Sequence, residues 1–216
     1  MTDGIEWVYV DDALLALNKS SGLLSVPGRG TDKQDCASAR AQQLYADARV
    51  VHRLDMATSG LMLMARGPEM QRLLNRAFVE RRICKRYIAL VAGHLESTPS
   101  VWSDIDLPLM ADWPRRPLQK VDRAGRPSQT GWRIVAWEED ARGYPCTRLE
   151  LEPITGRSHQ LRVHLQAIGH AILGDALYGP PDQDGASARL MLHASSLSLL
   201  HPMTGTALDL NSPPPF

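Results

Sequence analysis

The sequence predicts an α+β fold with a mixed, mainly antiparallel central sheet flanked by helices. Short β-like runs follow one another closely along the chain, as in sheets built from neighbouring strands. Only three segments space their apolar residues as a helix does. The composition, 44% hydrophobic and 22% charged, is that of a globular chain. Because no linker interrupts the 216 residues, we expect a single domain over residues 1–216.

The N-terminal part is expected to begin with a hairpin. Residues 6–10 and 14–18 alternate like strands around an acidic turn. A glycine-rich loop, residues 22–30, comes next. Asp35 then stands where it can cap a helix running from residue 36 to about residue 45.

The central part is expected to hold a strand, a helix and a second strand. Residues 61–65 are apolar, and a helix with one apolar face follows from Pro68 to Phe78. Residues 87–91 form a short apolar run, typical of a strand buried on both faces. Residues 97–128 contain many prolines, so we expect a mostly irregular surface segment.

The C-terminal part is expected to add four strands and a helix. Strands are predicted at 129–137 and 147–152, and two more within 190–210. Leu161, Leu165 and Ile168 share one helical face, with Ser158 as the expected cap and Gly169 as the stop.

Several classes of protein are disfavoured by composition. No apolar run approaches the ~20 residues that span a bilayer, and no secretory signal is visible, so we expect a cytoplasmic protein without a membrane partner. The three cysteines, Cys36, Cys84 and Cys146, form no CxxC pair, which argues against a disulfide framework and a zinc knuckle.

The 24 basic and 24 acidic residues cancel, but they are not evenly distributed. Two segments are rich in cations: Arg72, Arg76, Arg81, Arg82, Lys85 and Arg86 in the first, and Arg115, Arg116, Lys120, Arg123 and Arg126 in the second. A neutral protein can in this way present a positive face to nucleic acid. Ordinary solvated faces explain the same pattern, and composition leaves both readings open.

The most informative segment is Val51 to Gly60, VHRLDMATSG. It lies between two predicted strands, so a loop of small polar residues is held by rigid supports and can present a carboxylate in a fixed position. From the residues alone, His52 and Asp55 form either a hydrogen-bonded structural pair or part of a catalytic site.

The whole string resembles the HRLDxxTSG signature of the RluA family of pseudouridine synthases. Further segments are similar to that family in the same order: Lys85-Arg86-Tyr87, Thr155 to His164, Gly174 to Gly179, and Leu192 to Ala194. Ser20 departs from the pattern, in which proline is expected. The resemblance implies the pseudouridine synthase fold and an isomerase that converts uridine in RNA to pseudouridine.

Residues 22–28 and 112–121 resemble most closely the dual-specificity members of the family. This implies uridine substrates in 23S rRNA and in the tRNA anticodon stem-loop. The chain also leaves no room for an extra S4 domain, so we expect the catalytic domain alone, acting as a monomer.

The resemblance implies a role for each candidate site residue. The catalytic residues would be Asp55, Tyr87 and Arg162. The RNA-binding residues would be Arg53, His52, Arg81, Arg82, Lys85, Arg115, Arg116, Arg157 and His159. Isomerisation involves neither redox change nor hydrolysis, so we expect no metal and no nucleotide cofactor. One carboxylate suffices, whether it attacks C6 of the base or C1′ of the sugar.

Two alternatives differ in class. A zinc hydrolase would use histidines such as His159 and His164, but their i,i+5 spacing and the absence of HExxH disfavour it. A non-catalytic RNA-binding module of the same fold would be expected to have lost Asp55, Tyr87 or Arg162, and all three are present.

Overall fold

The computed structural model describes residues 5–179 and 187–216. The chain divides into two compact units, each described by itself: unit 1 takes residues 1–85 and 193–215, and unit 2 takes residues 86–192 and Phe216. The chain passes from unit 1 to unit 2 inside strand β5, Cys84–Ala92. The expectation of a single domain stays a prediction.

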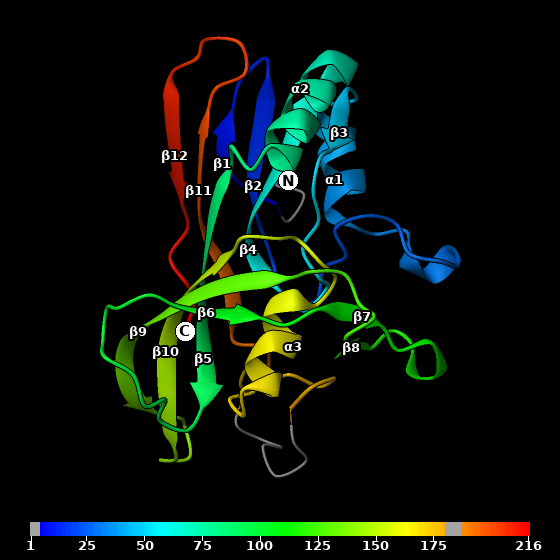
Figure 1. The fold of residues 1–216 in the computed structure, drawn as a ribbon. Helices are drawn as coiled ribbons and strands as arrows, with labels where there is room; N and C mark the ends of the chain where they lie inside the picture. Colours follow the sequence, from blue (N-terminus) through cyan, green and yellow to red (C-terminus); the bar gives the residue numbers. More distant parts are fainter. Residues whose placement is uncertain (1–4, 180–186) are drawn as a thin grey trace. The chain divides into compact units, whose positions relative to one another are not determined.

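In its described residues, unit 1 is a sheet with two α-helices, which Figure 1 labels α1 and α2. Its strands are β1 Glu6–Val10, β2 Leu14–Lys19, β3 Ala48–Val50, β4 Ser59–Arg66, β11 Leu192–Leu200 and β12 Ala207–Asn211. The path runs β1-β2-β4-β11, with β12 beside β11 and β3 beside β4. These pairs are antiparallel except for β4 with β11, which is parallel.

The helices of unit 1 are α1 Ala37–Leu44 and α2 Gly67–Val79, and a 3-10 turn covers Thr31–Lys33. The predicted start of α2 at Pro68 is confirmed, with the proline in the first turn. The predicted cap of α1 is wrong by one residue. Cys36 is the N-cap, and its Sγ accepts from Ala39 N at 3.4 Å, whereas Asp35 is bound to Arg40 instead.

The core of unit 1 lies between α2 and the sheet. Leu14, Leu61, Leu74, Leu197 and Leu210 come from five different elements and are all buried in one cluster. Burying such side chains stabilises a fold by about 1.5–3 kcal/mol each. Strand β4, which leads away from residues 51–58, is therefore anchored in a packed core.

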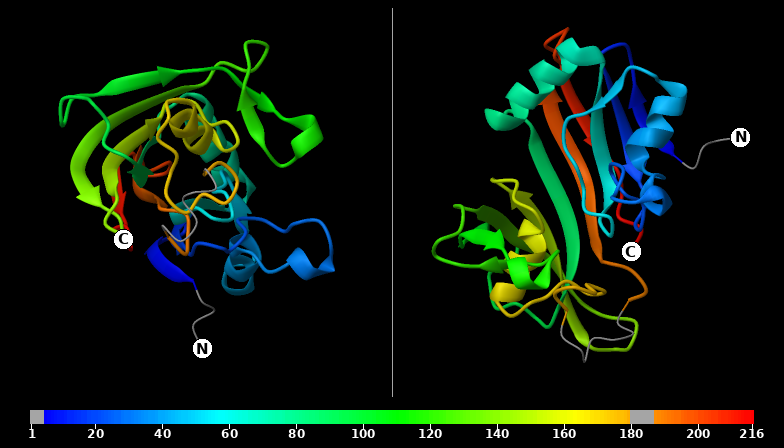
Figure 2. Two further views of the ribbon diagram at one scale, coloured as in Figure 1. Left: turned by 90° about the horizontal axis from the view of Figure 1, so that it is seen from below. Right: turned by 90° about the vertical axis from the view of Figure 1, so that its right-hand side faces the viewer.

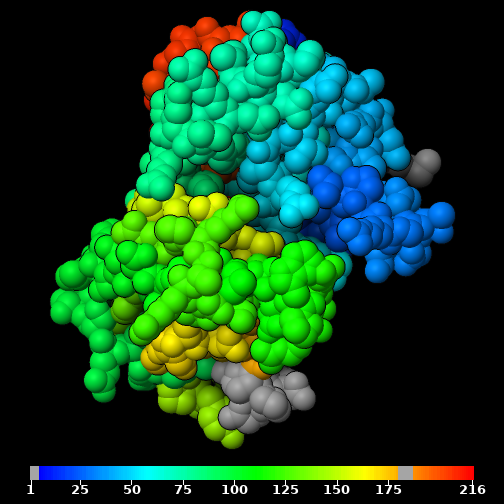
Figure 3. All heavy atoms as spheres, turned by 45° about the vertical axis from the view of Figure 1, so that its right-hand side comes forward, coloured from blue at the N-terminus to red at the C-terminus, as the bar shows by residue number. Residues whose placement is uncertain are grey.

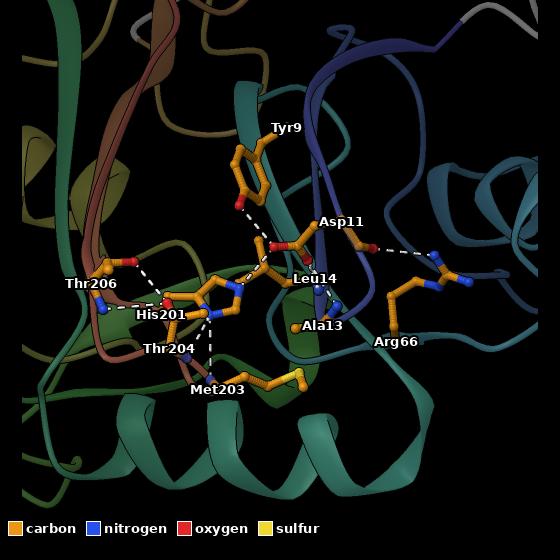
Figure 4. A network of polar contacts seen from close by, with 9 residues as sticks. All are labelled: Tyr9, Asp11, Ala13, Leu14, Arg66, His201, Met203, Thr204 and Thr206. Carbon is orange, nitrogen blue, oxygen red and sulfur yellow. Dashed lines mark hydrogen bonds and ion pairs between the residues drawn. The ribbon is translucent and has the colours of Figure 1, made fainter.

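Two turns of unit 1 are joined by a polar network (Figure 4). Asp11, in the turn between β1 and β2, accepts from Tyr9 Oη at 2.7 Å and from His201 Nε2 at 2.8 Å. Nδ1 of His201 accepts from the Met203 and Thr204 amides, which fixes the proton on Nε2. Burial opposes ionisation of Asp11, but its hydrogen bonds outweigh burial and lower the pKa of the carboxyl.

The described residues of unit 2 form a four-stranded antiparallel sheet and one α-helix. The order is β5-β10-β9-β6, with β6 Ser103–Asp106, β9 Gln129–Glu139 and β10 Pro145–Pro153. Helix α3 covers Gln160–Ala167. A separate hairpin pairs β7 Leu109–Ala111 with β8 Gln119–Val121, and a 3-10 turn, Trp113–Arg115, lies between them.

The predicted α+β class and the mainly antiparallel sheet are confirmed. Two local predictions in unit 2 differ from the structure. The proline-rich stretch 97–128 holds three short strands, because isolated apolar residues such as Ile105 and Leu109 are buried there. Helix α3 has His159, not Ser158, at its N-cap, in the left-handed region at φ 55° and without a side-chain cap.

Candidate active site

The loop of residues 51–58, here the Asp55 loop, joins β3 to β4 in unit 1. His52 fixes its beginning, because Nε2 accepts from the Leu63 amide at 2.8 Å. The His52 ring also packs on Phe78 with 4.9 Å between centroids. Burial, reinforced by the charge of Lys85, lowers the pKa of His52 to about 3. The imidazole is therefore neutral at pH 7 and carries its proton on Nδ1.

The glycine-rich loop after β2 holds the backbone on both sides of Asp55. Ser25 Oγ donates to Leu54 O at 2.7 Å and accepts from Leu54 N at 3.1 Å. Ser21 Oγ donates to Ala57 O at 2.7 Å, and Gly22 N donates to Met56 O at 2.9 Å. The residues before and after Asp55 thus have their polar backbone atoms satisfied.

A buried lysine completes this support. Lys19 is 1% exposed, and its Nζ donates to Ser20 O at 2.9 Å, Leu23 O at 2.7 Å and Met56 O at 3.0 Å. Three carbonyl dipoles converge on one ammonium, which offsets the cost of burying its charge. Lys19 therefore ties the glycine-rich loop to the residue that follows Asp55.

The end of the Asp55 loop is fixed against β11. Ser59 Oγ donates to His193 Nδ1 at 2.8 Å, and His193 Nε2 donates to Ser212 O at 3.1 Å. Gly60 has φ 108°, and a Cβ there would lie 2.3 Å from Ala194 O. Only glycine permits this approach of β4 to β11.

In unit 2, the segment around α3 forms a directed hydrogen-bond chain. His164 Nε2 donates to Leu107 O at 2.9 Å, and its Nδ1 accepts from Thr130 Oγ1 at 2.9 Å. Gln160 Nε2 donates to Thr130 Oγ1 at 3.0 Å, and Gln160 Oε1 accepts from Thr155 and from the Arg157 amide. Burial lowers the pKa of His164, which keeps this ring neutral.

Arg162, a predicted catalytic residue, is held by Asp175. Its Nε donates to Oδ2 at 2.8 Å and its Nη2 to Oδ1 at 2.6 Å, and both side chains are buried. Oδ1 of Asp175 also accepts from the amides of Leu177 and Tyr178. The pair uses two of the five guanidinium N–H donors and sets the plane of the group.

Tyr87, the third predicted catalytic residue, lies in β5 opposite Leu151 and is half-buried. A different tyrosine is also tied to the α3 region. Tyr178 Oη lies 2.6 Å from His159 Nδ1 and accepts from the Gln119 amide at 2.8 Å, while the Arg162 guanidinium lies 5.0 Å from its ring centroid.

The predicted RNA-binding cations differ in their surroundings. Arg82 pairs with Glu80 at 2.6 Å and Arg115 with Asp112 at 2.6 Å, while Arg157 donates weakly to Pro127 O at 3.4 Å. Arg53 and Arg81 are exposed, and Lys85 is half-buried at the start of β5. His52 and His159 are both engaged by protein atoms. Their contacts with RNA stay predictions.

The residues that the sequence did not single out are Lys19, Ser25, Asp175 and Tyr178. The last two lie inside the string Gly174 to Gly179. Lys19 follows an apolar strand and precedes a run of small residues, a pattern typical of many surface lysines. Only the fold shows that its side chain turns inward.

In residues 5–179 and 187–216, no three His, Cys, Asp or Glu side chains are grouped as metal ligands. No helix among these residues is long and apolar enough to cross a membrane. The three cysteines are free thiols.

Comparison with known proteins shows the family to which this chain belongs. The profile of the family described as RNA pseudouridylate synthase matches residues 13–167. The human protein RNA Pseudouridylate Synthase Domain Containing 1 has a similar structure, with a TM-score of 0.82 at 27% identity, covering 100% of this chain and 86% of that one. The chain therefore belongs to the RNA pseudouridine synthases, the isomerases that convert uridine in RNA to pseudouridine.

Within this class the chain is of the RluA type. It is 48% identical over 198 residues to the dual-specificity RNA pseudouridine synthase RluA of Vibrio vulnificus (strain CMCP6), covering 91% of this chain and 78% of that protein. It is 45% identical over 210 residues to the protein of the same name from Escherichia coli (strain K12), covering 97% and 93%.

Proposed function

We propose that this enzyme modifies uridines in both 23S rRNA and the tRNA anticodon stem-loop, with Asp55 as the catalytic carboxylate acting on a flipped-out uridine. The support for two RNA classes is the 48% identity to a dual-specificity relative over most of the chain. The enzyme would act as a cytoplasmic monomer without metal or nucleotide cofactor.

The observation that carries the role of Asp55 is the fixation of the backbone on both sides of it by residues 19–25. Ser25 holds Leu54, Lys19 and Gly22 hold Met56, and Ser21 holds Ala57. A carboxylate on such a backbone keeps its position when substrate binds, and this preorganisation is what transition-state stabilisation requires.

The reaction balances without a co-substrate. The bond between N1 and C1′ breaks, the uracil turns, and a bond between C5 and C1′ forms. C5 loses a proton and N1 gains one. The carboxylate of Asp55 adds either to C6 of the base, and leaves after the C5–C1′ bond has formed, or to C1′ of the sugar, and leaves as C5 takes its place there.

The other predicted residues have distinct tasks in this proposal. Arg162 provides the cation of the catalytic set, and Tyr87 stacks on the base and assists removal of the C5 proton. Arg53 fills the space of the flipped uridine, and the remaining cations hold phosphates. The bidentate ion pair with Asp175 supports a fixed orientation for the Arg162 guanidinium.

The decisive experiment maps pseudouridine in a synthetic anticodon stem-loop and in a 23S rRNA fragment after incubation with Asp55→Asn and wild-type enzyme. Asn keeps the size and removes the charge, so we expect isomerisation of both RNAs by the wild type and none by Asp55→Asn, which should still bind RNA. Asp12→Asn, which changes a carboxylate in the turn after β1 of unit 1, is the matched control.

Three outcomes would contradict the proposal. Isomerisation of only one RNA would remove the dual specificity. A folded Asp55→Asn variant that turned over near the wild-type rate would remove the catalytic role of Asp55. Activity that is abolished by a chelator and restored by zinc would contradict a reaction without a metal cofactor.

A further inference from the structure

We infer that Trp113 is a stacking platform for an unpaired nucleobase of the RNA substrate, next to a cluster of phosphate-binding arginines. The inference deepens the proposed function and rests on RNA as substrate. Trp113 lies in residues 112–118, here the tryptophan loop, between β7 and β8. In Figures 1 and 2 this hairpin stands away from the four-stranded sheet of unit 2.

The indole is presented to solvent with one face open. Trp113 is 62% exposed, although it is the largest and one of the most apolar side chains in the segment. The Arg116 guanidinium lies 3.6 Å from its ring centroid and covers one face. An indole covered on both faces would not keep this exposure, so the second face is accessible to a planar partner.

Hydrogen bonds between residues of the tryptophan loop fix its conformation. Asp112 is buried and accepts from Arg115 Nε at 2.8 Å. Asp112 N donates to Leu118 O at 2.9 Å, and Leu118 N donates to Arg115 O at 3.0 Å, which close the loop at its base. A platform fixed before binding loses little conformational entropy when a base stacks on it.

The base of the hairpin is anchored in unit 2. Leu109 and Leu118 pack with Val163 of α3 and with Tyr178, and the Gln119 amide donates to Tyr178 Oη. Tyr178 is the residue that also contacts His159. The platform is therefore attached to the segment around α3 that carries Arg162.

The charge of the surrounding segment indicates which partner stacks there. Residues 112–126 hold five cations against two carboxylates, Asp112 and Asp122. These acids pair with Arg115 and Lys120. Within the described residues no ion pair involves Arg116, Arg123 or Arg126, and all three are exposed. The exposed indole is thus surrounded by cations in this segment, which suits a base with its flanking phosphates. Figure 3 shows the green residues of this part of the chain at the surface of unit 2.

A second aromatic in unit 2 provides a matched contrast. Tyr144 is 61% exposed and has the Arg142 guanidinium 4.9 Å from its ring centroid. It lies next to the acidic residues Glu138, Glu139 and Asp140. Both rings are exposed and lie beside an arginine, but Arg142 is paired with Asp140 and the charge around Tyr144 is acidic, so phosphate-bearing RNA should favour Trp113 alone.

The test measures binding of a dye-labelled synthetic anticodon stem-loop RNA to wild type, Trp113→Ala, Trp113→Phe and Tyr144→Ala. Removing one base-aromatic stack should raise the Kd about 5- to 150-fold in Trp113→Ala. Trp113→Phe should recover most of the affinity, and Tyr144→Ala should bind as the wild type does. The turnover number at saturating RNA should change less than about twofold, because the platform binds and does not react.

The salt dependence separates stacking from charge. In Trp113→Ala the slope of log K against log salt should equal that of the wild type, whereas Arg116→Ala should make it shallower by about 0.7–0.9. A Trp113→Ala variant within twofold of wild-type Kd, or an equal loss in Tyr144→Ala, would overturn the inference. If the wild type binds this RNA without isomerising it, the proposed function fails. The comparison of Kd values still tests the stacking role of Trp113 in that case.

Discussion

Lys19 Nζ donates to the carbonyl oxygen of Met56 at 3.0 Å, one residue beyond the proposed catalytic Asp55. The same ammonium holds two carbonyls of the glycine-rich loop, so one buried charge joins two segments 37 residues apart in the chain. The position of the Asp55 loop therefore depends on a residue that carries no chemistry itself.

Replacing Lys19 with Met should destabilise the protein and slow turnover. The change leaves three carbonyls without their charged donor, which costs roughly 3 kcal/mol or more in the free energy of unfolding. Urea unfolding and turnover at saturating RNA measure both effects. Lys33→Met, which changes an exposed lysine of the neighbouring 3-10 turn, is the control and should change neither. Wild-type stability in Lys19→Met would show that these hydrogen bonds contribute nothing net.

Gly60→Ala should be far more harmful than Gly67→Ala. Both glycines have positive φ, 108° and 73°, so alanine strains either backbone. At Gly60 the added Cβ would also lie 2.3 Å from Ala194 O, whereas nothing lies within 4 Å at Gly67. We expect a loss of about 1–2 kcal/mol for Gly67→Ala and a loss of folding or a several-fold larger destabilisation for Gly60→Ala. Similar melting temperatures for the two variants would contradict the close approach of β4 to β11.

Mild acid should destabilise the protein through His52. Its folded pKa of about 3 lies below the ordinary value of 6.5, so between these values the unfolded chain binds a proton that the folded chain does not. The contribution of His52 is complete above pH 6.5 and is lost as the pH falls toward 3, at no more than ~1.4 kcal/mol per pH unit.

The measurement compares urea unfolding of the wild type and His52→Gln from about pH 4.5 to 6.5, inside the window between the two pKa values of His52. Gln keeps an acceptor for the Leu63 amide and does not titrate, so the pH slope of stability should be smaller in the variant. His164, whose pKa is also lowered, acts with the same sign but is present in both proteins and cancels in the difference. Equal slopes would mean that His52 is not buried as a neutral ring.

The parts of the site that the sequence predicted are those in which local pattern and chemistry coincide. Val51 to Gly60 indicates a rigidly held loop because small polar residues stand between two strand-like runs. The roles of Asp55, Tyr87 and Arg162 follow from resemblance. Residue types alone do not distinguish a catalytic arginine from a surface one, and the ion pair of Arg162 with Asp175 is visible only in the fold.

The supporting residues that the sequence did not predict act through distant partners. Lys19 and Met56 lie 37 positions apart in the sequence, and the local spacing of apolar residues does not indicate that the Lys19 side chain is buried. The predicted caps are wrong for a different, local reason. Asp35 and Ser158 are favourable capping types, but Asp35 is bound by Arg40, five residues along the chain, and His159 in a left-handed conformation begins α3. Residue type alone therefore does not fix the cap position there.

Replacing both Arg81 and Arg82, at the C-terminal end of α2, with Ala should weaken RNA binding. Arg82 is exposed and pairs with Glu80, and Arg81 is exposed at φ 55°. Exposed ion pairs contribute little to stability, and both Arg and Ala carry a Cβ, so the double alanine variant should fold as the wild type does.

Without these cations, two RNA phosphates keep their condensed counterions when the complex forms. We expect the Kd for stem-loop RNA to rise about tenfold and the salt slope to fall by about 0.7–0.9 for each phosphate left without its arginine, while turnover at saturating RNA changes less than about twofold. Arg142→Ala, in the acidic turn of unit 2, is the control and should leave the Kd unchanged. A double variant that bound RNA normally but turned over slowly would move these arginines from RNA positioning to the chemical step.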